Sequence, residues 1–112
     1  MSEARLKSEV WVKAQLRLCD VNAMPCVISK RGDADAGQVL VKVIKSRADC
    51  DLLARRYMDD AARAWTVIVH GGEHDCDAYI EREADVDADL WVLEIEDPKG
   101  NYLPDGEEPL RP

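Results

Sequence analysis

Asp87–Gly100, read DADLWVLEIEDPKG, is the stretch that decides the fold of this chain. Residues 90–96 alternate as a strand does, so that one face of the extended chain would carry only the apolar side chains of Trp91, Leu93 and Ile95. Residues 97–100, Asp-Pro-Lys-Gly, have the composition of a tight turn. The stretch therefore predicts a strand near the middle of a sheet, ended by a turn.

Four segments before this strand also predict β-structure. Residues 39–45 (VLVKVIK) and 65–70 (WTVIVH) are rich in β-branched side chains, and residues 26–30 and 50–57 are weaker candidates. In the two stronger segments we expect one apolar face each, made by Val39, Val41 and Val43 and by Trp65, Val67 and Val69. Short loops between the four segments favour an antiparallel meander.

Two segments predict helices. Residues 9–22 follow Ser8, a potential N-cap, and their apolar side would carry Trp11, Ala14, Leu18 and Val21. Alternation at residues 10–18 leaves a strand as the alternative for this segment. The second helix begins with three acidic residues near position 73 and runs to about Ala84, with its buried side made by Cys76, Tyr79 and Ile80.

The order helix, four strands, helix, strand predicts an α+β fold. We expect a single domain over residues 1–103, with a mostly antiparallel sheet of about five strands and both helices on one face. A length of 112 residues is enough for one hydrophobic core. Residues 104–112 contain three prolines and few apolar side chains, so they predict a disordered tail.

The charges of the chain are divided unevenly between its two halves. The net charge is −8, but residues 1–56 hold 11 Lys and Arg against 7 Asp and Glu, whereas residues 57–112 hold 4 against 16. The first half is therefore basic and the second strongly acidic. Since nucleic-acid binding depends on a net basic surface, this distribution makes nucleic acid an unlikely partner and favours charge pairing between the halves.

Nothing in the sequence predicts export or membrane insertion. The N-terminus lacks the apolar run of a secretory signal, and no segment approaches the length of a membrane span, so we expect a soluble, cytoplasmic protein. Its four cysteines, Cys19, Cys26, Cys50 and Cys76, have no CxxC spacing. We therefore expect reduced thiols.

Three segments together, SEVWVKAQLRLC, RGDADAGQVLVKV and DAYIEREADVDADLWVLEIEDPKG, resemble domain-of-unknown-function family 1491, a family of short bacterial proteins. The resemblance covers residues 8 to about 103. It implies a single intracellular bacterial domain, and it implies no catalytic role for any residue.

His70, His74 and Cys76 are the best candidates for metal binding. Imidazole and thiolate ligands suit zinc, but the spacing H-x3-H-x-C matches no established zinc motif. A loop histidine and a core cysteine are the simpler interpretation, so we assign neither a metal nor any other cofactor.

Two further groupings suggest chemistry. Glu94 and Glu96 lie on one strand face and would form a carboxylate pair, although solvent-facing glutamates that pair with Lys42 or Lys45 are commoner. A Cys–His nucleophile pair could be formed by Cys26 or Cys50 with His70, but buried cysteines usually only pack.

Lys42, Lys45, Arg47, Arg55 and Arg56 form the only basic concentration. It suits a nucleic-acid backbone, an acidic protein, or the acidic half of a second copy in a homodimer. The function that the sequence favours is a small non-catalytic binding or interaction protein. A metal-binding protein or small metal-dependent enzyme, and a nucleic-acid accessory protein, remain the alternatives.

Overall fold

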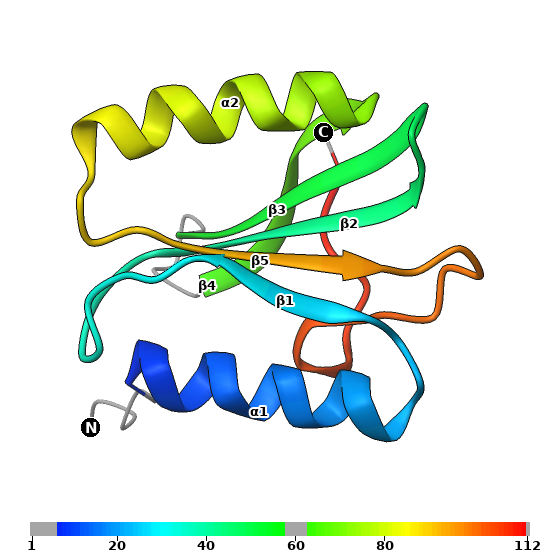
Figure 1. Cartoon of the computed structure of the whole chain (residues 1–112), viewed down its shortest axis with the longest axis horizontal. Coiled ribbons are helices and arrows are strands. Elements are labelled where there is room, and N and C mark those ends of the chain that lie inside the picture. Colours follow the sequence, from blue (N-terminus) through cyan, green and yellow to red (C-terminus); the bar gives the residue numbers. More distant parts are fainter. Residues whose placement is uncertain (1–6, 58–62, 112) are drawn as a thin grey trace.

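The structure, a computed structural model, describes residues 7–57 and 63–111. Within these described residues, two helices and five strands make up one α+β domain (Figure 1). In chain order they are α1 (Ser8–Val21), β1 (Cys26–Lys30), β2 (Val39–Ser46), β3 (Asp49–Tyr57), β4 (Arg63–Gly71), α2 (Glu73–Val86) and β5 (Trp91–Glu96). A short 3₁₀ turn, Pro104–Gly106, follows.

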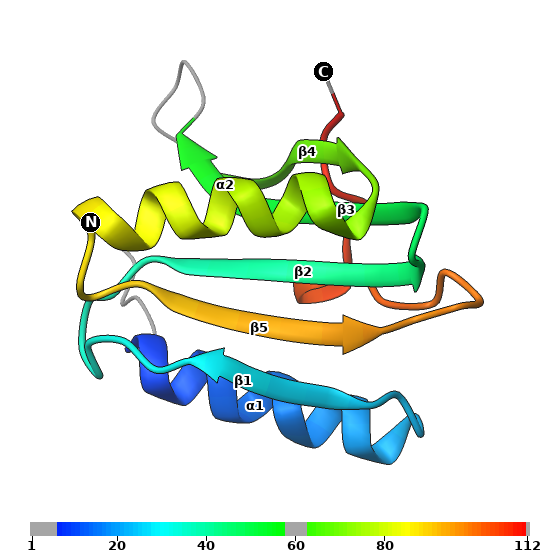
Figure 2. The ribbon, with the colours of Figure 1, turned by 45° about the horizontal axis from the view of Figure 1, so that its top comes forward.

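The predicted central strand is confirmed. β5 lies between β1 and β2 in the sheet order β1-β5-β2-β3-β4, as Figure 2 shows. It pairs antiparallel with β1 and parallel with β2. At its end the Gly100 N–H donates to the Asp97 carbonyl, which closes the predicted turn. The expected four-strand meander is thus only partly right: β2, β3 and β4 form it, but β1 joins the sheet through β5.

The two helices cover opposite faces of the sheet, and not one face as the element order suggested (Figure 1). The reason is that β5 is apolar on both sides at its start. Trp91, Leu93 and Ile95 pack with Trp11 and other residues of the α1 layer, whereas Leu90 and Val92 pack in the α2 layer. A sheet with two apolar faces needs a helix on each.

Helix α1 is confirmed as a helix, but its buried side differs from the expected one. The residues that face the core are Trp11, Val12, Gln15 and Cys19. Gln15 is buried because its side-chain oxygen accepts a hydrogen bond from the Tyr102 hydroxyl at 2.8 Å. Ser8 is the first helical residue, not the N-cap, and its hydroxyl donates to the Gly37 carbonyl.

The pairing register of β4 changes within the strand. Leu53 is opposite Val67, but Leu52 is opposite Val69, so one extra residue of β4 lies between these two pairs. Such a bulge reverses the side-chain alternation. Trp65 and Val67 therefore share the face that packs against α1, whereas Val69 belongs to the α2 layer, so the expected common face of all three is wrong for Val69.

Residues 104–111, for which the sequence predicted disorder, lie against the sheet. The Val67 N–H donates to the Leu110 carbonyl, and the Leu110 N–H donates to the Trp65 carbonyl. Pro104 is fully buried. Neither helix of the described residues is long and apolar enough to cross a membrane.

Candidate functional site

A buried lysine on β2, Lys42, lies at the centre of the candidate site. Leu40, Lys42 and Ile44 alternate toward α2, and Lys42 is only 2% exposed. Its ammonium lies 2.6 Å from a carboxylate oxygen of Asp77, 2.9 Å from one of Glu73 and 3.6 Å from one of Glu94. Three carboxylates thus surround one ammonium.

The fold explains why these carboxylates meet. Glu73 and Asp77 are one helical turn apart on α2, and Glu94 is opposite Lys42 on the neighbouring parallel strand. Burial alone would lower the pKa of Lys42, but hydrogen bonds to Asp77 and Glu73 and the charge of Glu94 outweigh it and raise the pKa above the ordinary lysine value. Lys42 is therefore protonated at neutral pH.

The start of α2 is held in place by its own acidic residues. The Asp75 carboxylate accepts a hydrogen bond from the Gly72 N–H at 3.0 Å, and the Glu73 N–H donates to the Arg47 carbonyl at 2.8 Å. Carboxylates at a helix N-terminus are favoured by the helix dipole. These contacts fix Glu73 at the border of the sheet.

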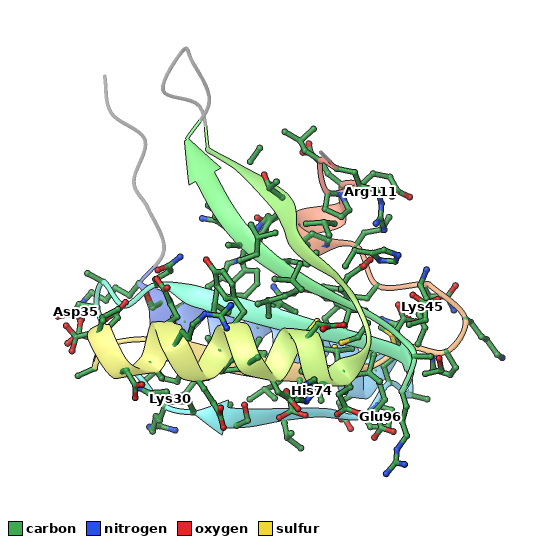
Figure 3. The ribbon with its side chains drawn as sticks, turned by 90° about the horizontal axis from the view of Figure 1, so that it is seen from above. Lys30, Asp35, Lys45, His74, Glu96 and Arg111 are labelled. Carbon is green, nitrogen blue, oxygen red and sulfur yellow. The ribbon has the colours of Figure 1, made fainter. Side chains whose placement is uncertain are left out.

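Next to this ion cluster, a groove of about 460 Å³ lies over β1, β5 and β2 beside the start of α2. Figure 3 shows the labelled Lys45 and Glu96 near the end of α2 that carries His74. We call this groove the sheet groove. Its lining residues are Pro25, Val27, Ile44, Lys45, Ser46, Arg47, Glu73, Glu94, Glu96 and Pro98. Glu94 and Glu96, the carboxylate pair considered from the sequence, both line the groove. Glu94 faces Lys42, which agrees with the simpler interpretation that it pairs with a lysine on the neighbouring strand.

The three metal candidates have separate environments. The Nδ1 of His70 lies 2.6 Å from a carboxylate oxygen of Asp51, the side chain of His74 is exposed on α2, and Cys76 is buried between α2 and the sheet. Within residues 7–57 and 63–111, no three His, Cys, Asp or Glu side chains are arranged to hold a metal ion. The sequence cluster thus does not become a spatial one.

The four cysteines are free and form two neighbouring pairs, one on each side of the sheet. The contact with the Cys76 thiol, together with burial, raises the pKa of Cys50. Burial, with the Cys19 thiol nearby, raises the pKa of Cys26 to about 12. Cys26 and Cys50 therefore remain protonated at neutral pH, which makes them poor nucleophiles. The pKa of Cys76, by contrast, is lowered by its hydrogen bond with the Cys50 thiol.

The basic residues that cluster in the sequence have different roles in space. Lys42 is buried in its ion cluster, and Arg55 pairs with Asp105 at 2.8 Å. Lys45 and Arg47 are exposed at the sheet groove. The side chain of Arg56 lies outside the described residues.

Sequence reasoning missed Asp105, which joins several distant residues. Its carboxylate accepts hydrogen bonds from the indole N–H groups of Trp11 and Trp65, each at 2.9 Å, and from Arg55. The two indole rings stack with centroids 4.9 Å apart, and the Arg55 guanidinium lies over both. The available signal was the turn composition Pro104-Asp105-Gly106 and the need of buried indoles for an acceptor.

A second carboxylate also fastens the C-terminal segment. On β3, the Asp51 carboxylate accepts a hydrogen bond from the Arg111 guanidinium at 2.8 Å and another from the Nδ1 of His70. Burial alone would raise the pKa of Asp51, but the hydrogen bonds from His70 and Arg111 hold it below its ordinary value.

Comparison with known proteins agrees with the sequence resemblance. Residues 6–105 match the family described as "Protein of unknown function (DUF1491)". A crystal structure of a DUF1491 family protein from Caulobacter crescentus CB15 is 37% identical, with a TM-score of 0.78 over 87% of this chain and 92% of the other. An NMR structure of a DUF1491 family protein from the same organism gives the same identity and TM-score over 88% of this chain and 92% of the other.

A third similar structure is the solution structure of protein Atu0922 from A. tumefaciens. It is 30% identical, with a TM-score of 0.65 over 84% of this chain and 87% of the other. A search of curated proteins finds no match. The family match covers most of the sequence and the same fold recurs in its solved members, so this chain belongs to the DUF1491 family.

Proposed function

We propose that this protein is a small, cytoplasmic, non-catalytic binding protein that receives a segment of another protein in the sheet groove. The observation that carries the proposal is the groove itself, which lies beside the Lys42 ion cluster and has about 460 Å³ of space. Rigid strands and the start of α2 form its walls, so the groove is preformed.

The lining of the groove suits a polypeptide. Pro25, Val27, Ile44 and Pro98 supply apolar surface. Exposed charges of both signs border it, with Glu96 on β5 and Lys45 at the end of β2. A peptide segment offers apolar side chains together with both kinds of charge, which is the mixture found at the rims of protein interfaces.

The protonation of the reactive groups supports binding over catalysis. A lysine acts as a base or nucleophile only when its pKa is lowered, whereas that of Lys42 is raised. Cys50 is protonated and buried, and the Nδ1 of His70 is held by Asp51. The strongest candidates for chemistry are thus committed to structural contacts.

The groove also favours protein over nucleic acid. Glu73, Glu94 and Glu96 would repel phosphates, and Lys42 lies too deep to reach a nucleic-acid backbone. If a nucleic-acid accessory role were correct, the protein would be retained on heparin and released as salt rises.

The test is an affinity capture from bacterial extract with three tagged proteins: the parent, Glu96→Lys in the groove and Glu81→Lys on the exposed side of α2. Both variants make the same change of charge, so Glu81→Lys controls for net charge. We expect a specific protein bound by the parent and by Glu81→Lys, weakened by salt and lost from Glu96→Lys.

Val27→Asp, which places a charge on the apolar part of the groove, is expected to lose the same protein. Identical captured proteins from all four baits, or no captured protein from the parent, would contradict the proposal.

A further inference from the structure

The outer edge of β4 is covered by a short piece of the C-terminal segment. The Val67 N–H donates to the Leu110 carbonyl at 2.8 Å, and the Leu110 N–H donates to the Trp65 carbonyl at 2.9 Å. Leu110 thus pairs with Thr66 as a parallel strand would. Figure 2 shows this segment, drawn in red, where it passes β4. We call residues 108–111 the edge cover.

Few contacts hold the edge cover in place. Apart from the two backbone hydrogen bonds, the Arg111 guanidinium donates to the Asp51 carboxylate at 2.8 Å. The Leu110 side chain is 43% exposed, and Glu108 is exposed as well. Because the edge cover buries little apolar surface, it can open locally while the rest of the fold stays intact.

The strand under the edge cover is suited to pairing with an extended chain. Residues 64–69, AWTVIV, carry no charged side chain, and the register change of β4 comes only after Val67. The Trp65 carbonyl and the Val67 N–H therefore point outward from a regular piece of strand. Native proteins cover or charge such an edge, because its unpaired backbone groups are a template for another strand.

The opposite edge of the sheet is protected in another way. β1 is only five residues long, ends at Lys30, and has an irregular register between Ile28 and Lys30. Short length, a lysine and a bulge each discourage pairing at an edge. β4, with nine residues, has the edge cover instead.

We propose that the β4 edge is a binding site for an extended segment of another protein, and that the edge cover is a built-in competitor for this site. The edge cover also indicates the chemistry of the ligand, because it already occupies the site. Leu110 supplies the paired backbone, and the next residue, Arg111, supplies a cation for Asp51. The ligand is therefore a strand parallel to β4 in which an arginine follows an aliphatic residue.

Asp51 gives the site its selectivity. Its side chain is only 9% exposed and lies on β3, the strand next to β4. The Nδ1 of His70 binds one carboxylate oxygen, and Arg111 binds the other. An arginine of the ligand can take the place of Arg111, whereas an acidic residue there would be repelled.

This site is separate from the sheet groove. β4 forms one edge of the sheet, whereas the groove lies over β1, β5 and β2. The two binding proposals can therefore be tested with different variants, and the failure of one leaves the other unchanged.

The test uses full-length protein and the synthetic peptide Glu-Glu-Pro-Leu-Arg-Pro, which has the sequence of residues 107–112. Binding is measured by NMR titration of the backbone amides. Leu110→Pro removes the N–H that donates to Trp65, so it should open the site. We expect this variant to bind the peptide with a dissociation constant in the millimolar range and with the largest shifts near Val67. The parent should bind at least about threefold more weakly, because its own segment fills the site.

Glu108→Pro is the matched control for the introduced proline. The Glu108 N–H has no backbone acceptor among residues 7–57 and 63–111, so this variant should bind the peptide as weakly as the parent. Arg111→Glu, which repels Asp51, should open the site as Leu110→Pro does. Replacing the arginine of the peptide by glutamate should weaken its binding to Leu110→Pro at least about threefold.

Amide hydrogen exchange in the parent gives an independent measurement. Val67 should exchange much faster than Val41 on the interior strand β2, because opening of the edge cover exposes the Val67 N–H without unfolding the sheet. Circular dichroism establishes that each variant is folded.

Three outcomes overturn the proposal: no binding of the peptide to folded Leu110→Pro, equal binding by this variant and the parent, or a Val67 amide that exchanges as slowly as that of Val41. Self-association of Leu110→Pro in analytical ultracentrifugation, in place of peptide binding, would mean that the edge accepts a second copy and would overturn the arginine-containing ligand.

Discussion

The ammonium of Lys42 lies 2.6 Å from the carboxylate of Asp77, and this contact joins the basic half of the chain to its acidic half. Glu73 and Glu94, also from the acidic half, complete the cluster. Part of the opposite charge of the two halves is therefore paired inside the fold, where these ion pairs hold α2 against the sheet.

Replacing Lys42 should destabilise the protein. Lys42→Met keeps the volume but leaves three carboxylates together without a cation, and we expect a loss of about 2 kcal/mol at pH 7, less than for a fully buried pair because the carboxylates are partly exposed. Urea denaturation at pH 7 measures this loss of stability.

Lys45→Met is the control, because Lys45 is exposed on the same strand. It should change the free energy of unfolding by less than about 0.5 kcal/mol. Equal effects of the two substitutions would mean that the Lys42 cluster adds nothing to stability.

The C-terminal segment should be required for full stability. Removal of residues 104–112 deletes the acceptor of two indole N–H groups and of Arg55, so we expect a clear fall in the melting temperature. Asp105→Asn, which suits the positive φ of 53° at this position, should cost about 1–2 kcal/mol and change the tryptophan fluorescence. Glu108→Gln, a change of an exposed residue nearby, is the control and should leave the melting temperature unchanged. If removal of residues 104–112 also left the melting temperature unchanged, the tail would be disordered and this prediction would be wrong.

The Asp51 carboxylate should stabilise the fold at neutral pH, and this contribution should be lost at strongly acidic pH. Its pKa is lower in the folded than in the unfolded state, so its contribution is present above the unfolded value of about 3.9 and is lost as the pH falls through the folded value. Asp51→Asn should therefore be less stable at pH 7, and its free energy of unfolding should decline less between about pH 5 and pH 2. Asp49→Asn, at the start of the same strand, is the control. Parallel curves for the parent and Asp51→Asn would contradict this account.

Gly37 should not tolerate a side chain. A Cβ at this position would lie 2.2 Å from the Asp89 carbonyl oxygen and 2.9 Å from the indole ring of Trp91. We expect Gly37→Ala to cost about 1–3 kcal/mol through this clash, measured by thermal denaturation. Gly106→Ala has open space around it and should cost only the strain of its positive φ, about 1 kcal/mol. A Gly37→Ala protein as stable as the parent would show that the loop can move away from Trp91.

The strands and helices could be predicted from the sequence because their patterns are local. β5 is the clearest example, because alternating apolar side chains predicted the strand and the residues Asp-Pro-Lys-Gly predicted the turn that ends it. The helical period gave α1, but not its buried side, because α1 has apolar residues on two faces. That choice is made by residues far away, such as Tyr102, which binds Gln15.

The candidate site could be predicted only in part. The pairing of Glu94 with Lys42 follows from neighbouring strands, but the contributions of Glu73 and Asp77 depend on where α2 lies on the sheet. The role of Asp105 depends on two tryptophans 94 and 40 residues away in sequence. Contacts between such distant residues leave no periodic pattern in one sequence.

The position of β5 between β1 and β2 also has a consequence for folding on the ribosome. β2, β3 and β4 pair with their neighbours in the chain and can form hairpins early. β1, by contrast, pairs with β5, which follows it by more than 60 residues in the chain. The cores under both helices also lack the side chains of Trp91–Ile95 until β5 has left the ribosome. The sheet is therefore completed by a late insertion of β5, and nascent chains that end before residue 96 should stay open to proteases and chaperones.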